Sequence, residues 1–143
     1  MTEADPSTYE QTVRIEARPE TVWRYWTDPV RVCTWWGVRT ELDARRGGAC
    51  VVETGGGAVM RGEFVELVPH ERIVFTFGWD PMEGVPAVPP GSSRVEVTLT
   101  PDGDDTILVL RHSGLPPELA AQHRAGWGGA LELLATQAGE GRT

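Results

Sequence analysis

The stretch that decides the fold lies near the C-terminus, where residues 116–137 read PPELAAQHRAGWGGALELLATQ. Pro116 and Pro117 suit the first turn of a helix, because the N–H groups they lack would have no partner there. At 100° per residue, the apolar side chains and one histidine fall in a single broad stripe. The members of this stripe are Leu119, His123, Gly126, Trp127, Ala130, Leu133 and Leu134. The pattern predicts a long helix that buries one face.

Three glycines interrupt this predicted helix, at Gly126, Gly128 and Gly129. Each should cost about 1 kcal/mol relative to alanine. We therefore expect close packing or a local bend to offset the cost.

Most of the preceding chain alternates apolar and polar residues, which is typical of strands with one buried face. Glycine-rich turns separate these segments. The predicted strands cover residues 9–17, 38–44, 49–54, 59–68, 72–79, 94–100 and 106–112. Two short helices follow the first strand, one opened by Pro19 and one by Asp28 and Pro29 and ended by Gly37.

The order of these elements indicates the fold class. Consecutive strands joined by short turns pair antiparallel, and one amphipathic helix covers one face of such a sheet. We predict a single α+β domain over residues 9–138, flanked by a disordered tail at 1–8 and a frayed end at 139–143. In it, a curved antiparallel sheet of six to seven strands wraps around the C-terminal helix over an apolar cavity.

Composition excludes several classes of function. The net charge of -8 over 143 residues argues against nucleic acid and anionic lipid as partners. All the basic residues are arginines, so a lysine Schiff base is excluded. No secretory signal or membrane span is present, which predicts a cytoplasmic protein. Cys33 and Cys50 do not form a zinc pattern and are expected to be free thiols, although a disulfide between them is left open.

Short motifs along nearly the whole chain resemble those of a known family. They are PETVW (19–23), TDP (27–29), WWG (35–37), GEFVELVP (62–69), RIVFTF (72–77), RHSGLP (111–116) and HRAGW (123–127). Together they resemble the START-like or birch-pollen-allergen-like (SRPBCC) superfamily. Within it, the chain is similar to the bacterial branch homologous to the activator of the heat-shock protein 90 ATPase. The resemblance implies a helix-grip fold with a cavity for a hydrophobic ligand, but no particular reaction.

An aromatic set, with a few aliphatic and polar residues, is predicted to bind the ligand. Its members are Trp26, Trp36, Phe64, Phe75, Phe77, Trp79, Leu108, Leu110, His112, His123 and Trp127. Any one of them could instead fill the core. Six tryptophans in so small a domain favour a pocket for the group.

His112, His123 and Glu66 are the candidate catalytic residues. An ordinary histidine titrates near pH 6.5 and can act as acid or base; the alternative is a buried histidine held by hydrogen bonds. Glu66 has the strand parity of Phe64, so it could be an inward carboxylate, or else an outer-face partner of Arg61 or Arg72. Two histidines without a third ligand do not make a metal site, and no metal or cofactor is predicted.

Three functional hypotheses follow. The first is a monomer or homodimer that binds or carries a small hydrophobic ligand, and the second is a cyclase- or aromatase-type enzyme. The third is a module that interacts with a chaperone; the resemblance implies a separate N-terminal chaperone-binding domain, which these residues do not include. The proline-rich loop over residues 81–91 could gate the cavity or serve as a stiff connector.

Overall fold

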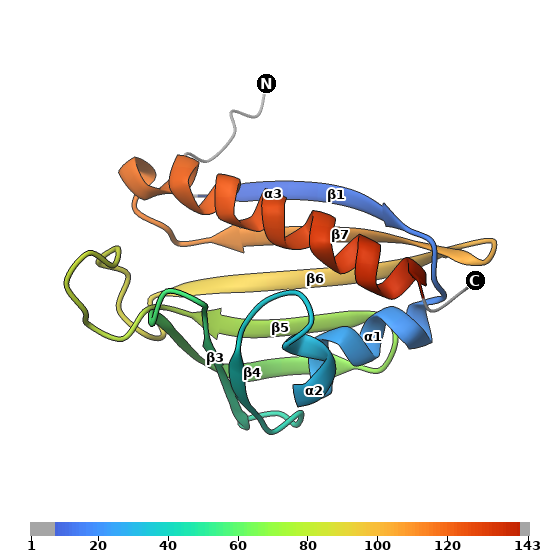
Figure 1. The fold of residues 1–143 in the computed structure, drawn as a ribbon, viewed down its shortest axis with the longest axis horizontal. Helices are drawn as coiled ribbons and strands as arrows, with labels where there is room; N and C mark the ends of the chain where they lie inside the picture. The colour runs from blue at the N-terminus through green and yellow to red at the C-terminus, as the bar shows by residue number, and fades with distance from the viewer. Residues whose placement is uncertain (1–7, 141–143) are drawn as a thin grey trace.

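In the computed structural model, which describes residues 8–140, one antiparallel sheet curves around a long helix (Figure 1). The strands are β1 (Tyr9–Ile15), β2 (Arg39–Leu42), β3 (Ala49–Glu53), β4 (Val59–Val68), β5 (Arg72–Phe77), β6 (Ser93–Asp102) and β7 (Asp105–Ser113). The helices are α1 (Pro19–Thr27), α2 (Pro29–Val32) and α3 (Pro117–Glu140). The predicted α+β helix-grip architecture is confirmed, and no helix of the described residues is long and apolar enough to cross a membrane.

The strand order in the sheet is β1-β7-β6-β5-β4-β3-β2, and every neighbouring pair is antiparallel. The first strand in the sequence therefore pairs with the last, with Val13 opposite Leu108. In Figure 1, α3 lies across the face of β1, β7 and β6. α1 lies near the C-terminal end of α3, and α2 lies next to α1. Loops border the opposite end of the sheet, near the start of α3 (Figure 1).

The buried face of α3 differs from the predicted stripe. Leu133 is 43% exposed, whereas Leu131, which the stripe omits, is fully buried. The residues that face the core are His123, Trp127, Leu131, Leu134 and Ala138. The predicted stripe is thus rotated toward the flank that carries Gly126 and Ala130, because sequence periodicity does not fix where the sheet lies.

Close packing, one of the two compensations predicted for the α3 glycines, is absent at two of the three positions. An added Cβ would meet nothing within 4 Å at Gly126 or Gly129, and only Gln11 Oε1, at 3.9 Å, at Gly128. The helix continues through all three. Open space, rather than close packing, lies beside Gly126 and Gly129.

Both ends of the domain extend or shift relative to the prediction. α3 reaches Glu140 and keeps Ala138 buried, so residues 139–140 are helical rather than frayed. Residues 1–7 and 141–143 of the predicted tails lie outside the described residues. Asp28 caps α2 as expected, accepting a hydrogen bond of 3.0 Å from the Val30 N–H, but α2 ends at Val32 rather than near Gly37.

A β-bulge in β4 decides the direction of Glu66. Phe64 pairs with Phe75 and Glu66 pairs with Val74, so two residues of β4 span one step of β5. The extra residue reverses the strand parity. Phe64 is buried in the core, while Glu66 is exposed and pairs with Arg72 at 2.5 Å. The alternative of an inward Glu66 is therefore wrong.

Candidate functional site

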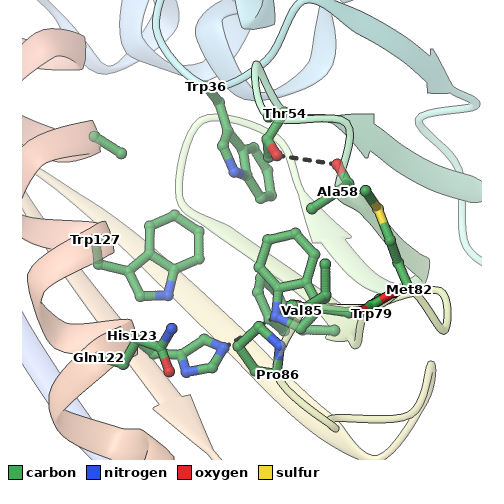
Figure 2. Close-up of a pocket in the computed structure, with 16 residues that line it drawn as sticks. Trp36, Thr54, Ala58, Trp79, Met82, Val85, Pro86, Gln122, His123 and Trp127 are labelled. Atoms are coloured by element: carbon green, nitrogen blue, oxygen red, sulfur yellow. Dashed lines mark hydrogen bonds between the residues drawn. The ribbon is translucent and has the colours of Figure 1, made fainter.

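A cavity of about 450 Å³ opens at the loop end of the sheet, beside the first half of α3. Figure 2 shows its walls: Trp127 and His123 extend from α3, Trp36 enters from the segment after α2, and Trp79, Val85 and Pro86 lie opposite. The lining residues are Trp36, Thr54, Gly56, Ala58, Phe77, Trp79, Met82, Glu83, Gly84, Val85, Pro86, Gln122, His123, Gly126, Trp127 and Ala130. The volume lies within the roughly 300–1,000 Å³ typical of small-molecule sites.

The structure divides the predicted ligand-binding residues into two groups. Five of them line the cavity: Trp36, Phe77, Trp79, His123 and Trp127. The others are buried but do not line it: Trp26, Phe64, Phe75, Leu108, Leu110 and His112. The second group packs behind the first, as in the 6.3 Å ring contact between Trp26 and Trp127.

His123 connects α3 to the segment that follows β5. Its Nε2 accepts a hydrogen bond of 3.0 Å from the indole N–H of Trp79, which Figure 2 marks with a dashed line. Because Nε2 is the acceptor, Nδ1 carries the proton and donates to the Leu119 carbonyl, 2.9 Å away. Both ring nitrogens are thus occupied.

His112 lies one layer deeper and is also saturated. Ser93 Oγ donates to the Phe77 carbonyl at 2.7 Å, so its hydroxyl proton is committed. The contact of 2.9 Å between Ser93 Oγ and His112 Nε2 must therefore use the proton of Nε2. On the other side, Nδ1 accepts a hydrogen bond of 3.0 Å from the indole N–H of Trp127.

Burial determines the protonation state of His112. The pKa of His112 is lowered from 6.5 to about 3, mainly because burial removes the ring from water. The nearby His123 lowers this pKa further. The sequence placed both histidines on inward faces, and the structure brings their rings to 5.8 Å from each other. Only His123 reaches the cavity wall. His112 is neutral and both of its nitrogens have hydrogen-bond partners. It is therefore suited to positioning Trp127 rather than to proton transfer.

Glu66 lies in a different hollow, of about 850 Å³, between α1, the β2–β3 turn and β4. That hollow is the larger of the two, but exposed charged side chains such as Arg45 and Arg46 form much of its wall. Arg72 also bonds Glu96, at 2.5 Å, so Glu66 belongs to a surface ion-pair network. The aromatic cavity is the better candidate site, because it combines apolar walls with a few buried polar groups.

The segment between β5 and β6 also supplies wall residues, among them Met82, Val85 and Pro86. This loop was expected either to gate the cavity or to serve as a stiff connector, but none of its residues was predicted to bind the ligand. It is held closely to the sheet: a Cβ on Gly78 would lie 2.2 Å from the Pro89 carbonyl oxygen. The backbone N–H of Trp79 also donates a hydrogen bond to the Val88 carbonyl at 2.6 Å. Only its proline content and its position next to Trp79 could have indicated that the loop forms a wall.

The polar inventory of the cavity is small. Glu83 is the only carboxylate in the lining and no arginine contributes to it. Within residues 8–140, no three His, Cys, Asp or Glu side chains gather as a metal site would require. Cys33 and Cys50 are free thiols outside the lining.

Comparison with known proteins gives one family and several similar structures. The family model described as Activator of Hsp90 ATPase homolog 1-like protein matches residues 16–139. No curated protein matches the sequence. Protein CV1439 from Chromobacterium violaceum is 29% identical, with a TM-score of 0.75 over 94% of this chain and 99% of that one.

Two further structures are informative. DynU16, a protein in the dynemicin biosynthetic locus, is 27% identical with a TM-score of 0.77. The match covers 91% of this chain but 46% of DynU16, so this chain spans about half the length of that relative. The Aha1 dimer from Colwellia psychrerythraea has a TM-score of 0.79 at 16% identity, over 95% of this chain and 98% of that one. This last likeness shows the shared fold.

Proposed function

The chain belongs to the family of Activator of Hsp90 ATPase homolog 1-like proteins, and on that premise we propose that it binds a small, flat, apolar compound in the cavity beside α3. The observation that carries the proposal is the wall of the cavity, where Trp36, Phe77, Trp79 and Trp127 surround about 450 Å³ of space. Aromatic rings give a flat ligand a large contact area, and they are already held in place by their mutual packing.

The way the rings are fixed supports binding. The indole N–H groups of Trp79 and Trp127 bond His123 and His112, both at 3.0 Å. The two rings therefore keep their orientation without a ligand, and little side-chain entropy has to be lost on binding. The similarity to a protein in the dynemicin biosynthetic locus fits a role in handling a small organic molecule.

Acid–base catalysis, the second hypothesis, has less support. Of its three candidate residues, only His123 lines the cavity. The lone pair that could take up a proton lies on Nε2, and it already accepts a hydrogen bond from the indole N–H of Trp79. Catalysis would therefore require Trp79 to move first. A His123→Gln variant that binds ligand but loses a turnover observed with the natural protein would restore this hypothesis.

The chaperone hypothesis predicts a broad exposed apolar patch. The exposed large apolar side chains of residues 8–140 are scattered over separate segments: Val30, Val38, Val68, Met82 and Leu133. They offer less support for a partner protein than the cavity offers for a ligand.

The glycines of α3 provide a matched test of the cavity. Gly126 lines it and Gly129 does not, and neither has an atom within 4 Å of an added Cβ. Leucine at either position should stabilise the helix by about 0.5–1 kcal/mol. We expect Gly126→Leu to weaken the binding of a neutral two-ring compound such as 1-naphthalenemethanol more than about tenfold, because the side chain takes the ligand's space. Isothermal titration calorimetry measures the affinity.

Gly129→Leu is the control, and it should leave the affinity unchanged. Equal losses in both variants would show that the ligand does not occupy the cavity. A natural protein that binds neither 1-naphthalenemethanol nor larger neutral aromatic compounds would contradict the proposed function itself.

A further inference from the structure

The charges around the cavity are strongly one-sided. None of the arginines within residues 8–140 lines it, whereas the carboxylate of Glu83 does. The chain as a whole carries a net charge of -8. A negatively charged ligand would therefore leave water without meeting a cation, which disfavours its binding.

Hydrogen-bond donors for an anion are equally scarce. The indole N–H groups of Trp79 and Trp127 are committed to the two histidines. The hydroxyl of Thr54 donates to the Ala58 carbonyl at 3.0 Å. His123 uses its only proton on the Leu119 carbonyl. These donors of the wall are thus occupied, and the side-chain donors that remain in the lining include the amide of Gln122, which is exposed to water.

The same wall suits a cation. The faces of aromatic rings carry negative potential, and they attract a cation that lies within about 6 Å of a ring centre. Trp36 and Trp127 lie with their ring centres 5.2 Å apart, and Phe77 and Trp79 lie 5.4 Å apart in an edge-to-face pair. Glu83, on the exposed loop at the rim, adds a full negative charge.

We infer that the site selects its ligand by charge: it accepts neutral and, preferentially, cationic aromatic compounds, with the cation beside Glu83, and it rejects aromatic carboxylates. This inference rests on the proposed function and narrows its ligand class. It assigns Glu83 as a residue that determines specificity.

Three probes of one shape test the inference. They share a naphthalene ring and differ in charge: 1-naphthalenemethanol, (1-naphthylmethyl)trimethylammonium and 1-naphthaleneacetate. Isothermal titration calorimetry at pH 8 measures the three affinities. At this pH, histidines with ordinary pKa values are neutral. We expect the cation to bind about two- to tenfold more tightly than the alcohol. The carboxylate should bind at least about tenfold more weakly than the alcohol.

Variants of two exposed glutamates assign the effect to a residue. Glu83→Gln should reduce the advantage of the cation over the alcohol by about two- to fivefold, the range of an exposed ion pair. Glu132→Gln, on α3 outside the lining, keeps the same overall charge change and should leave that advantage intact. An unchanged advantage in Glu83→Gln would overturn the assignment of Glu83.

The outcomes separate the two proposals. If the alcohol binds and the carboxylate binds equally well, the charge selection is wrong and the proposed function stands. If Gly126→Leu leaves the binding of the alcohol unchanged, or if neither the probes nor larger neutral aromatic compounds bind, both fall.

Discussion

Between pH 7 and pH 4.5 the free energy of unfolding is expected to fall by roughly 2–3 kcal/mol, because His112 takes up a proton only after the protein unfolds. The pKa of His112 is about 3 in the folded protein against 6.5 for the free side chain. The unfolded chain therefore binds the proton more tightly. The contribution of neutral His112 is complete above pH 6.5, declines as the pH falls, and levels off near pH 3.

Urea unfolding at a series of pH values measures this loss, and His112→Gln is the matched variant. Glutamine stays neutral and can both accept from Trp127 and donate to Ser93. Its stability curve should be flatter between pH 6.5 and 4.5, whatever its stability at neutral pH. Parallel curves would show that His112 does not cause the acid sensitivity.

Carboxylates act in a lower range of pH and can be separated from this effect. The Arg61 guanidinium, through its hydrogen bonds, lowers the pKa of the Asp80 carboxyl below its ordinary value of 3.8. Its contribution is therefore present above about pH 4 and is lost below it. The difference between the natural protein and His112→Gln therefore isolates the contribution of His112, because both proteins carry the same carboxylates.

The elements and the inward faces of the strands could be predicted from the sequence because periodicity follows directly from backbone geometry. The same rule failed at Glu66. A bulge adds one residue to β4 opposite the step between Val74 and Phe75, and parity after the bulge is reversed. No turn residue marks the bulge, so the outward direction of Glu66 depends on pairing with β5 that only the fold reveals.

Individual residues of the site were predictable on the regular elements, whereas for the loop only the alternative of gating the cavity was predicted, without its residues. His123 and Trp127 are four residues apart on α3, so they were expected to lie on one side of the helix. Which indole bonds which histidine depends on the distance between α3 and the sheet, and the sequence does not contain that distance. Val85 and Pro86 reach the cavity through the path of an irregular segment, for which no periodic rule exists.

Replacement of Trp127 by alanine should be the most damaging single change in the site. The side chain is 4% exposed and packs against Trp36, Phe77 and His112. Truncation of a buried tryptophan costs about 3–5 kcal/mol. The orphaned Nδ1 of His112 adds roughly 1–3 kcal/mol. Chemical denaturation is expected to show a protein that is largely unfolded or only marginally stable.

Trp127→Phe keeps most of the packing and isolates the hydrogen bond. Without the indole N–H, Nδ1 of His112 is unpaired and can be protonated without displacing a donor. We expect the free energy of unfolding to be about 1–3 kcal/mol lower at neutral pH. We also expect a rise in the pKa of His112, which would make the acid limb, the fall in stability below pH 6.5, less steep. Trp35→Phe is the control, since Trp35 is also 4% exposed and loses a hydrogen bond of 2.7 Å, but to the Tyr25 carbonyl. An equally shallow acid limb in both variants would show that the bond between Trp127 and His112 has no special part in keeping the histidine neutral. A shallow acid limb in Trp127→Phe alone would show that the indole N–H of Trp127, which lines the cavity, keeps His112 neutral behind it.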